Sequence, residues 1–65
     1  MSVAKVIELI AEGKTVEAAI EEAAKTAAKT VRKVRSIYVD GIQAMVKDGA
    51  VEKYRVNCKV TFVID

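Results

Sequence analysis

The sequence has no histidine and a single cysteine, Cys58, and these two facts limit the chemistry that the chain can perform. Histidine is the usual general base and a common zinc ligand, so its absence removes the ordinary catalytic triads and the Cys/His zinc sites. Cys58 falls on the apolar phase of a strand-like pattern, where a free cysteine acts as a small hydrophobic residue. No glycine-rich phosphate loop or calcium-loop motif occurs. The residues therefore predict a protein that is not an enzyme.

Several side chains could instead bind a ligand. Tyr38 and Tyr54 could stack on a planar molecule, although an aromatic residue in a strand also serves packing. A basic run could contact an anion, or it could lie in solvent and oppose a helix dipole. Carboxylates from separate parts of the chain could meet across subunits and bind a hard cation such as calcium. The basic residues are Lys29, Arg32, Lys33 and Arg35, and the carboxylates are Glu8, Glu12, Asp40, Asp48 and Glu52. The sequence assigns no particular residue as a metal ligand.

These side chains must be positioned by four predicted elements. Residues 2–11 mix apolar residues with isolated charges, which predicts a strand covered at least partly on both sides. Thr15 can cap a helix that begins at Val16. Apolar residues then recur every 3.6 residues on average, so we expect one helix over residues 16–35. Its narrow, alanine-rich stripe allows close packing on a sheet. The stripe consists of Val16, Ile20, Ala23, Ala27, Val31 and Val34.

Two strands follow the helix. The apolar phase shifts by one residue near Asp40-Gly41, which predicts a β-bulge in the second strand. Asp48-Gly49 is typical of a tight hairpin turn. Residues 54–64 alternate between apolar and polar, so we expect a third strand with Cys58 on its apolar face. The order predicts a single α+β domain over residues 1–65, with one helix on one face of a three-stranded antiparallel sheet.

The length of 65 residues indicates that the chain needs support from other subunits. A domain of this size buries only about 60% of the surface that its unfolded chain exposes. Many small domains gain stability from a disulfide or a zinc ion, but one cysteine and no histidine exclude an internal disulfide and the common zinc sites. One face of the predicted sheet also has no cover. We therefore expect a homo-oligomer.

Charge and hydropathy narrow the possible partners. Eleven basic and nine acidic residues give a formal net charge of +2, which does not favour nucleic acid as a partner. No stretch reaches the roughly 18 uncharged apolar residues of a membrane span, and the N-terminal residues do not resemble a secretory leader. The lone thiol is typical of a reducing compartment. We expect a cytoplasmic protein that binds neither membranes nor nucleic acid.

Over nearly its whole length the sequence resembles the dodecins, a family of very small proteins with a strand-helix-strand-strand subunit. The order and spacing of several local strings carry the resemblance. These strings are VAKVIEL at residues 3–9, the alanine-rich segment at 18–30, VEKYRV at 51–56 and VTF at 60–62. The resemblance implies a hollow homododecamer in which the sheet partly wraps the helix and the third strand lies between the other two. It also implies that ligands are held between subunits.

Many dodecins bind flavins, which stack on a Trp at the start of the second strand and receive hydrogen bonds from a Gln in the third. By this resemblance, Ser36 occupies the position of the Trp in this sequence and Arg55 occupies the position of the Gln. A serine has no aromatic face, and an arginine offers only donors, so we expect weak flavin binding. The sequence looks closer to dodecins without this pair, which include calcium-binding members.

We therefore expect a non-catalytic, homododecameric protein that binds or stores a small ligand, with Ser36, Tyr38 and Arg55 as candidate ligand-binding residues. Flavin is the ligand that the resemblance implies. Two other functions stay open, a calcium-binding dodecin and a purely structural assembly without a ligand.

Overall fold

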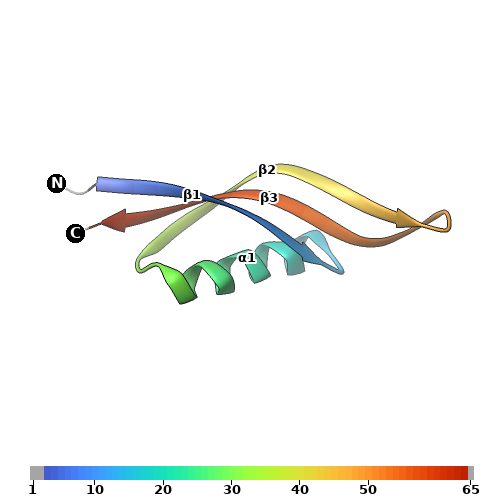
Figure 1. Ribbon diagram of the computed structural model, residues 1–65, viewed down its shortest axis with the longest axis horizontal. Coiled ribbons are helices and arrows are strands. Elements are labelled where there is room, and N and C mark those ends of the chain that lie inside the picture. Colours follow the sequence, from blue (N-terminus) through green and yellow to red (C-terminus); the bar gives the residue numbers. More distant parts are fainter. Residues whose placement is uncertain (1–2, 65) are drawn as a thin grey trace.

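The computed structural model describes residues 3–64 and contains one helix and three strands (Figure 1). The elements are β1 (Val3–Gly13), α1 (Val16–Thr30), β2 (Val34–Lys47) and β3 (Ala50–Ile64). The predicted order of strand, helix, strand and strand is confirmed. Ser2, which the prediction placed in the first strand, lies outside the described residues.

The strand order in the sheet is β1-β3-β2, with β3 antiparallel to both neighbours. The pairing of β1 with β3 runs from Val3 opposite Ile64 to Gly13 opposite Tyr54. The central position of the third strand, which the resemblance implied, is thus confirmed. As a consequence, residues of β3 contact both edge strands and join distant parts of the chain.

The turn and the bulge lie where the sequence predicts them. Asp48 and Gly49 connect β2 to β3 with φ angles of 53° and 79°. A tight hairpin turn requires positive φ angles at these two positions, and an Asp-Gly pair adopts them readily. The register of β2 against β3 shifts between Val39 and Gly41, which confirms the bulge. Two further shifts, between Val34 and Ser36 and between Met45 and Val46, have no clear signal in the sequence.

The helix begins at Val16 as predicted, and the Thr15 hydroxyl accepts a hydrogen bond from the Ala18 backbone N–H at 3.0 Å. The expected end near residue 35 is wrong, because α1 stops at Thr30 and Val31 is extended, with φ −131°. The chain then turns and Val34 pairs with Phe62 in the sheet. Val31 and Val34 still pack against the core after this turn, so their spacing imitated a longer helix.

Small side chains form the core between α1 and the sheet. Alanines of the helix face alternate residues of β3, and close approach of a helix to a sheet favours small residues at this contact. The buried residues of these two elements are Ala19, Ala23, Ala27, Val56, Cys58 and Val60. Within this chain β1 is covered on one side only, because Val6 and Ile10 are 55% and 67% exposed. Cover on both sides, as the sequence predicts, would require a second subunit and stays a prediction.

The β2–β3 hairpin extends well beyond the helix (Figure 1). The molecule is therefore elongated, with principal extents of 51 × 19 × 14 Å. Ile42, Val46 and Val51 on this hairpin are more than half exposed. Within residues 3–64 no helix has both the length and the apolar character needed to cross a membrane.

Candidate functional site

The sheet has an inner face, which packs on α1, and an outer face, which the helix does not cover. Side chains alternate along a strand, and Val56, Cys58 and Val60 of β3 point toward the helix. Arg55, Asn57 and other odd-numbered residues of β3 therefore lie on the outer face. Cross-strand partners share a face, so the register assigns the residues of β1 and β2 as well.

Ser36 and Tyr38 lie on the outer face of β2. Ser36 pairs with Thr61, and Tyr38 pairs with Lys59 two residues further along. Both are exposed, and the exposed fraction of Tyr38 is 64%. Tyr54, the other aromatic candidate, pairs with Gly13 and Ala44 on the inner face and is half-buried. Of the two tyrosines, Tyr38 is the one available to a ligand on the outer face.

Arg55 shares the outer face with Ser36 but lies far from it. The partner of Ser36 on β3 is Thr61, six residues from Arg55, which corresponds to about 20 Å along the strand. One chain therefore does not bring Ser36 and Arg55 together. A site that uses both residues has to be built from more than one subunit.

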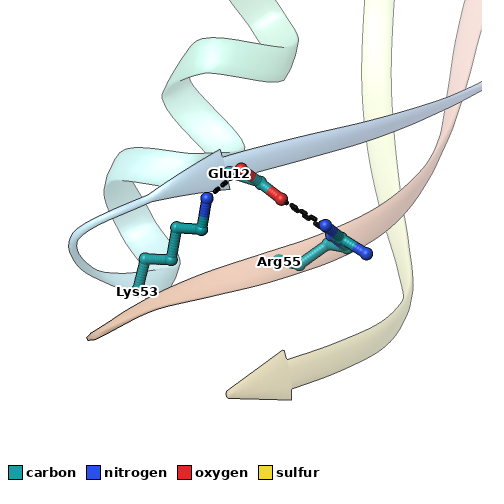
Figure 2. A network of polar contacts seen from close by, with 3 residues as sticks. All are labelled: Glu12, Lys53 and Arg55. Atoms are coloured by element: carbon teal, nitrogen blue, oxygen red, sulfur yellow. Dashed lines mark hydrogen bonds and ion pairs between the residues drawn. The ribbon is translucent and has the colours of Figure 1, made fainter. Parts of the chain in front are cut away.

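The Arg55 guanidinium is held by Glu12 of the neighbouring strand (Figure 2). Its Nε and Nη2 donate to Oε2 of Glu12 at 2.8 and 2.6 Å, and Lys53 Nζ donates to Oε1 at 2.8 Å. The hydrogen bonds from Lys53 and Arg55 lower the pKa of the Glu12 carboxyl below its ordinary value. Arg55 is thus engaged on two of its donors, and Glu12 is engaged on both oxygens.

The sequence did not predict this ionic cluster. Glu12 was a candidate for binding a cation, yet the structure pairs it with two basic residues that lie 41 and 43 positions away. Only the β1–β3 register, which places Glu12 opposite Arg55, brings these charges together. If the register had been known, the opposite charges of Glu12 and Arg55 at directly paired positions would have predicted this cluster.

The remaining candidate carboxylates form no metal centre within residues 3–64 of one chain. Asp40 Oδ2 lies 4.0 Å from Lys59 Nζ, which is a loose ion pair between half-exposed side chains. Within the described part of the chain, no three His, Cys, Asp or Glu side chains are grouped closely enough to hold a metal ion. The basic candidates Lys29, Arg32, Lys33 and Arg35 are all exposed.

Cys58 is buried on the inner face, with 2% of its surface exposed. Burial raises the pKa of its thiol, so the reactive thiolate is disfavoured at neutral pH. The sequence-based prediction that Cys58 packs in the core is confirmed.

Two hollows lie along β1. One, of about 410 Å³, lies between β1 and α1 and has Glu12 and Arg55 in its wall. The other, of about 470 Å³, lies beside the β2 bulge. It is lined by Glu8, Leu9, Ile10, Asp40, Asn57 and Cys58. Its side-chain amide, Asn57, was not singled out from the sequence, because an isolated asparagine in a strand carries no motif.

The chain matches the family model described as Dodecin over residues 3–65. Among solved structures, the chain is similar to the tt0972 protein from Thermus thermophilus, with 30% identity and a TM-score of 0.93 over 100% of this chain and 97% of that one. It is also similar to dodecin from Streptomyces coelicolor, with 25% identity and a TM-score of 0.91 over 98% of this chain and 93% of that one. Comparison with curated protein sequences finds no match.

Proposed function

The chain belongs to the dodecin family, and on this basis we propose that it is a non-catalytic, homododecameric protein that binds or stores a small ligand. The observation that carries the proposal is the match to the family over residues 3–65. The exposed outer face supports it, because Val6, Ile10 and Tyr38 present apolar surface that a single chain leaves in water. We also propose a cytoplasmic location, because the single cysteine is a free thiol.

We expect flavin to be a weak ligand at the place where the family resemblance puts it. Ser36 has no aromatic face, and a stacked ring contributes about 1–3 kcal/mol by analogy with base stacking. A site shared by two subunits would lose this contribution twice. Arg55 is already bound to Glu12, so its Nε and Nη2 have a competing acceptor. Since 1.4 kcal/mol is about a factor of ten, the affinity should be weaker by roughly a hundredfold or more than with a Trp and a Gln.

Titration of riboflavin with the protein, followed by quenching of flavin fluorescence, tests this proposal. We expect weak quenching by the natural sequence and much tighter quenching by the double variant Ser36→Trp, Arg55→Gln. The matched control is Ser36→Ala, Arg55→Ala, which removes the same side chains without adding a ring. Tight quenching by the natural sequence would contradict the role given to Ser36. No gain in the double variant, with the assembly intact by sedimentation, would contradict the placement of the site.

Calcium binding and a ligand-free structural assembly are the two other candidate functions. A calcium site would need carboxylates of more than one subunit, because residues 3–64 of a single chain group no three suitable ligands. A melting temperature that rises with calcium, in a protein that does not respond to riboflavin, would support calcium binding. The absence of both responses would support a structural assembly.

A further inference from the structure

The chain contains two Asp-Gly pairs, and an aspartate that precedes a glycine is prone to isomerisation. Asp40-Gly41 lies at the bulge of β2, and Asp48-Gly49 forms the turn between β2 and β3. A glycine has no Cβ to hinder the approach of its backbone nitrogen to the aspartate side chain. Both pairs meet this requirement, so the surroundings of each pair decide which one reacts.

The reaction is chemically self-sufficient, because it uses only the chain and water. The backbone nitrogen of the glycine attacks Cγ of the aspartate, and an N–Cγ bond forms. A water molecule leaves, made from the amide hydrogen and the carboxyl OH group, and the product is a cyclic succinimide. Water then adds to a carbonyl carbon of the ring and breaks its bond to nitrogen. When it adds at the backbone carbonyl, the chain runs on through the former side-chain carboxyl as isoaspartate.

The Asp48-Gly49 pair has the freedom that this attack requires. It is an exposed turn at the end of the hairpin that projects past the helix (Figure 1). A Cβ built on Gly49 would meet no heavy atom within 4 Å beyond the neighbouring residues. Within residues 3–64 the Asp48 carboxylate makes no hydrogen bond or ion pair. Exposed turns open locally at little cost in free energy, so the Gly49 nitrogen can reach Cγ of Asp48.

The Asp40-Gly41 pair is restrained by the sheet. The residues on both sides of Asp40 pair with β3, and Gly41 itself pairs with Asn57. Rotation of the Asp40 backbone into the ring geometry would therefore open the middle of the β2–β3 pair, which costs more than opening its end. The Asp40 carboxylate also lies 4.0 Å from Lys59 Nζ, so attack by the Gly41 nitrogen would compete with this ion pair.

We propose that Asp48 is a site of spontaneous isomerisation to isoaspartate in the folded protein and that the sheet protects Asp40. The change adds a backbone carbon to a turn whose length sets the hairpin register. It therefore loosens the end of the hairpin, where Val46 pairs with Val51. The modified residue carries a free carboxyl group of the kind that isoaspartyl methyltransferases methylate, which makes an enzyme of this class the expected partner.

Incubation of the folded protein at neutral pH, beside the same protein unfolded in guanidinium chloride, tests the proposal. Fragmentation of tryptic peptides by electron transfer distinguishes isoaspartate from aspartate at each position. In the folded protein we expect isoaspartate to form at least about tenfold faster at Asp48 than at Asp40, because only Asp40 requires the sheet to open. In the unfolded chain the two rates should agree within about threefold, because the sheet no longer restrains Asp40.

Two results would overturn the proposal. One is a rate at Asp40 that equals or exceeds the rate at Asp48 in the folded protein. The other is the same preference for Asp48 in the unfolded chain, because the fold would then not be its cause. Neither measurement involves a ligand, so either result would leave the proposed function standing.

Variants provide a second readout, the methyl groups that an isoaspartyl methyltransferase transfers to the incubated protein. Asp48→Glu should lose most of this methylation, because attack on a glutamate would have to close a larger, slower-forming ring. Asp40→Glu is the matched control and should be methylated like the natural protein. Methylation of Asp48→Glu at the natural level would overturn Asp48 as the site.

Discussion

Glu12 has an influence on this fold that its place in the sequence does not reveal. It accepts hydrogen bonds from Lys53 and Arg55 and so joins the end of β1 to the start of β3 (Figure 2). The side chains are more than a third exposed, so solvent screens these pairs and their effect on stability is modest. The cluster nevertheless holds the Arg55 guanidinium against Glu12.

The lowered pKa of Glu12 predicts an acid-dependent loss of stability. A carboxyl group whose pKa is lower in the folded state stabilises the fold above its ordinary pKa of 4.5, and this contribution is lost as the pH falls through the lower folded value. Melting temperatures of the natural protein should therefore fall more steeply below about pH 4.5 than those of Glu12→Gln. Glu8→Gln is the control, because the structure shows no ion pair of Glu8 with residues 3–64. Parallel pH profiles for the natural protein and Glu12→Gln would contradict the prediction.

Cys58 should be structural. Replacement by Ala removes one buried sulfur from the core, and we expect a cost on the order of 1 kcal/mol in the free energy of unfolding, measured by urea denaturation. Burial raises the pKa of the thiol, so labelling by a thiol reagent at neutral pH should be much slower in the native protein than in the urea-unfolded chain. Equal labelling rates in the two states would contradict a buried position.

Among the elements, the junction of β1 and α1 determines how closely the helix packs on the sheet. Gly13 ends the strand, Thr15 caps the helix, and the first turn of α1 folds back over the glycine. A Cβ on Gly13 would lie 2.6 Å from the Ala19 nitrogen and 2.9 Å from the Ala18 carbonyl carbon. Both are backbone atoms, so the clash can be relieved only by a shift of the helix relative to β1.

Gly13→Ala should therefore destabilise the fold by about 1–3 kcal/mol, the usual cost of overpacking. Gly41→Ala is a matched control in β2, the other edge strand, because its Cβ would meet no atom closer than 3.9 Å. Urea unfolding midpoints of the two variants measure the difference. A Gly13→Ala protein as stable as Gly41→Ala would show that the helix can shift away at little cost.

The whole molecule is too elongated for a chain of 65 residues to shield its apolar side chains. The hairpin projects past α1, and Val46, near its tip, is 65% exposed (Figure 1). The outer face adds further apolar surface at Val6 and Ile10. Small domains without disulfides or metals commonly gain stability from burial between subunits, so we expect other copies to pack on this surface.

We expect no stable folded monomer at micromolar concentration. Sedimentation should show a large assembly, and Val46→Asp should weaken it, because an uncompensated charge would enter a buried contact. Lys47→Glu, at the adjacent exposed position, is the control for a change of charge alone. A folded species of 7.1 kDa as the main component of the natural protein would contradict the prediction.

Features that depend on neighbouring residues could be predicted from the amino-acid sequence. Thr15 predicted the start of α1 through helix capping, and Asp48-Gly49 predicted the turn through its positive φ angles. Gly41 predicted the bulge through the shift in strand phase. All three are local properties of the chain. The alternation in β3 likewise predicted that Cys58 points to the core.

Features that depend on pairing between distant residues required the three-dimensional structure. The end of α1 at Thr30 follows from the return of Val34 into the sheet, which periodicity could not distinguish from a longer helix. The engagement of Arg55 by Glu12 follows from the register of β1 against β3, which places the two residues directly opposite each other. The register is set by packing over the whole sheet, because a slip of one residue would turn every buried side chain of a strand to the outer face.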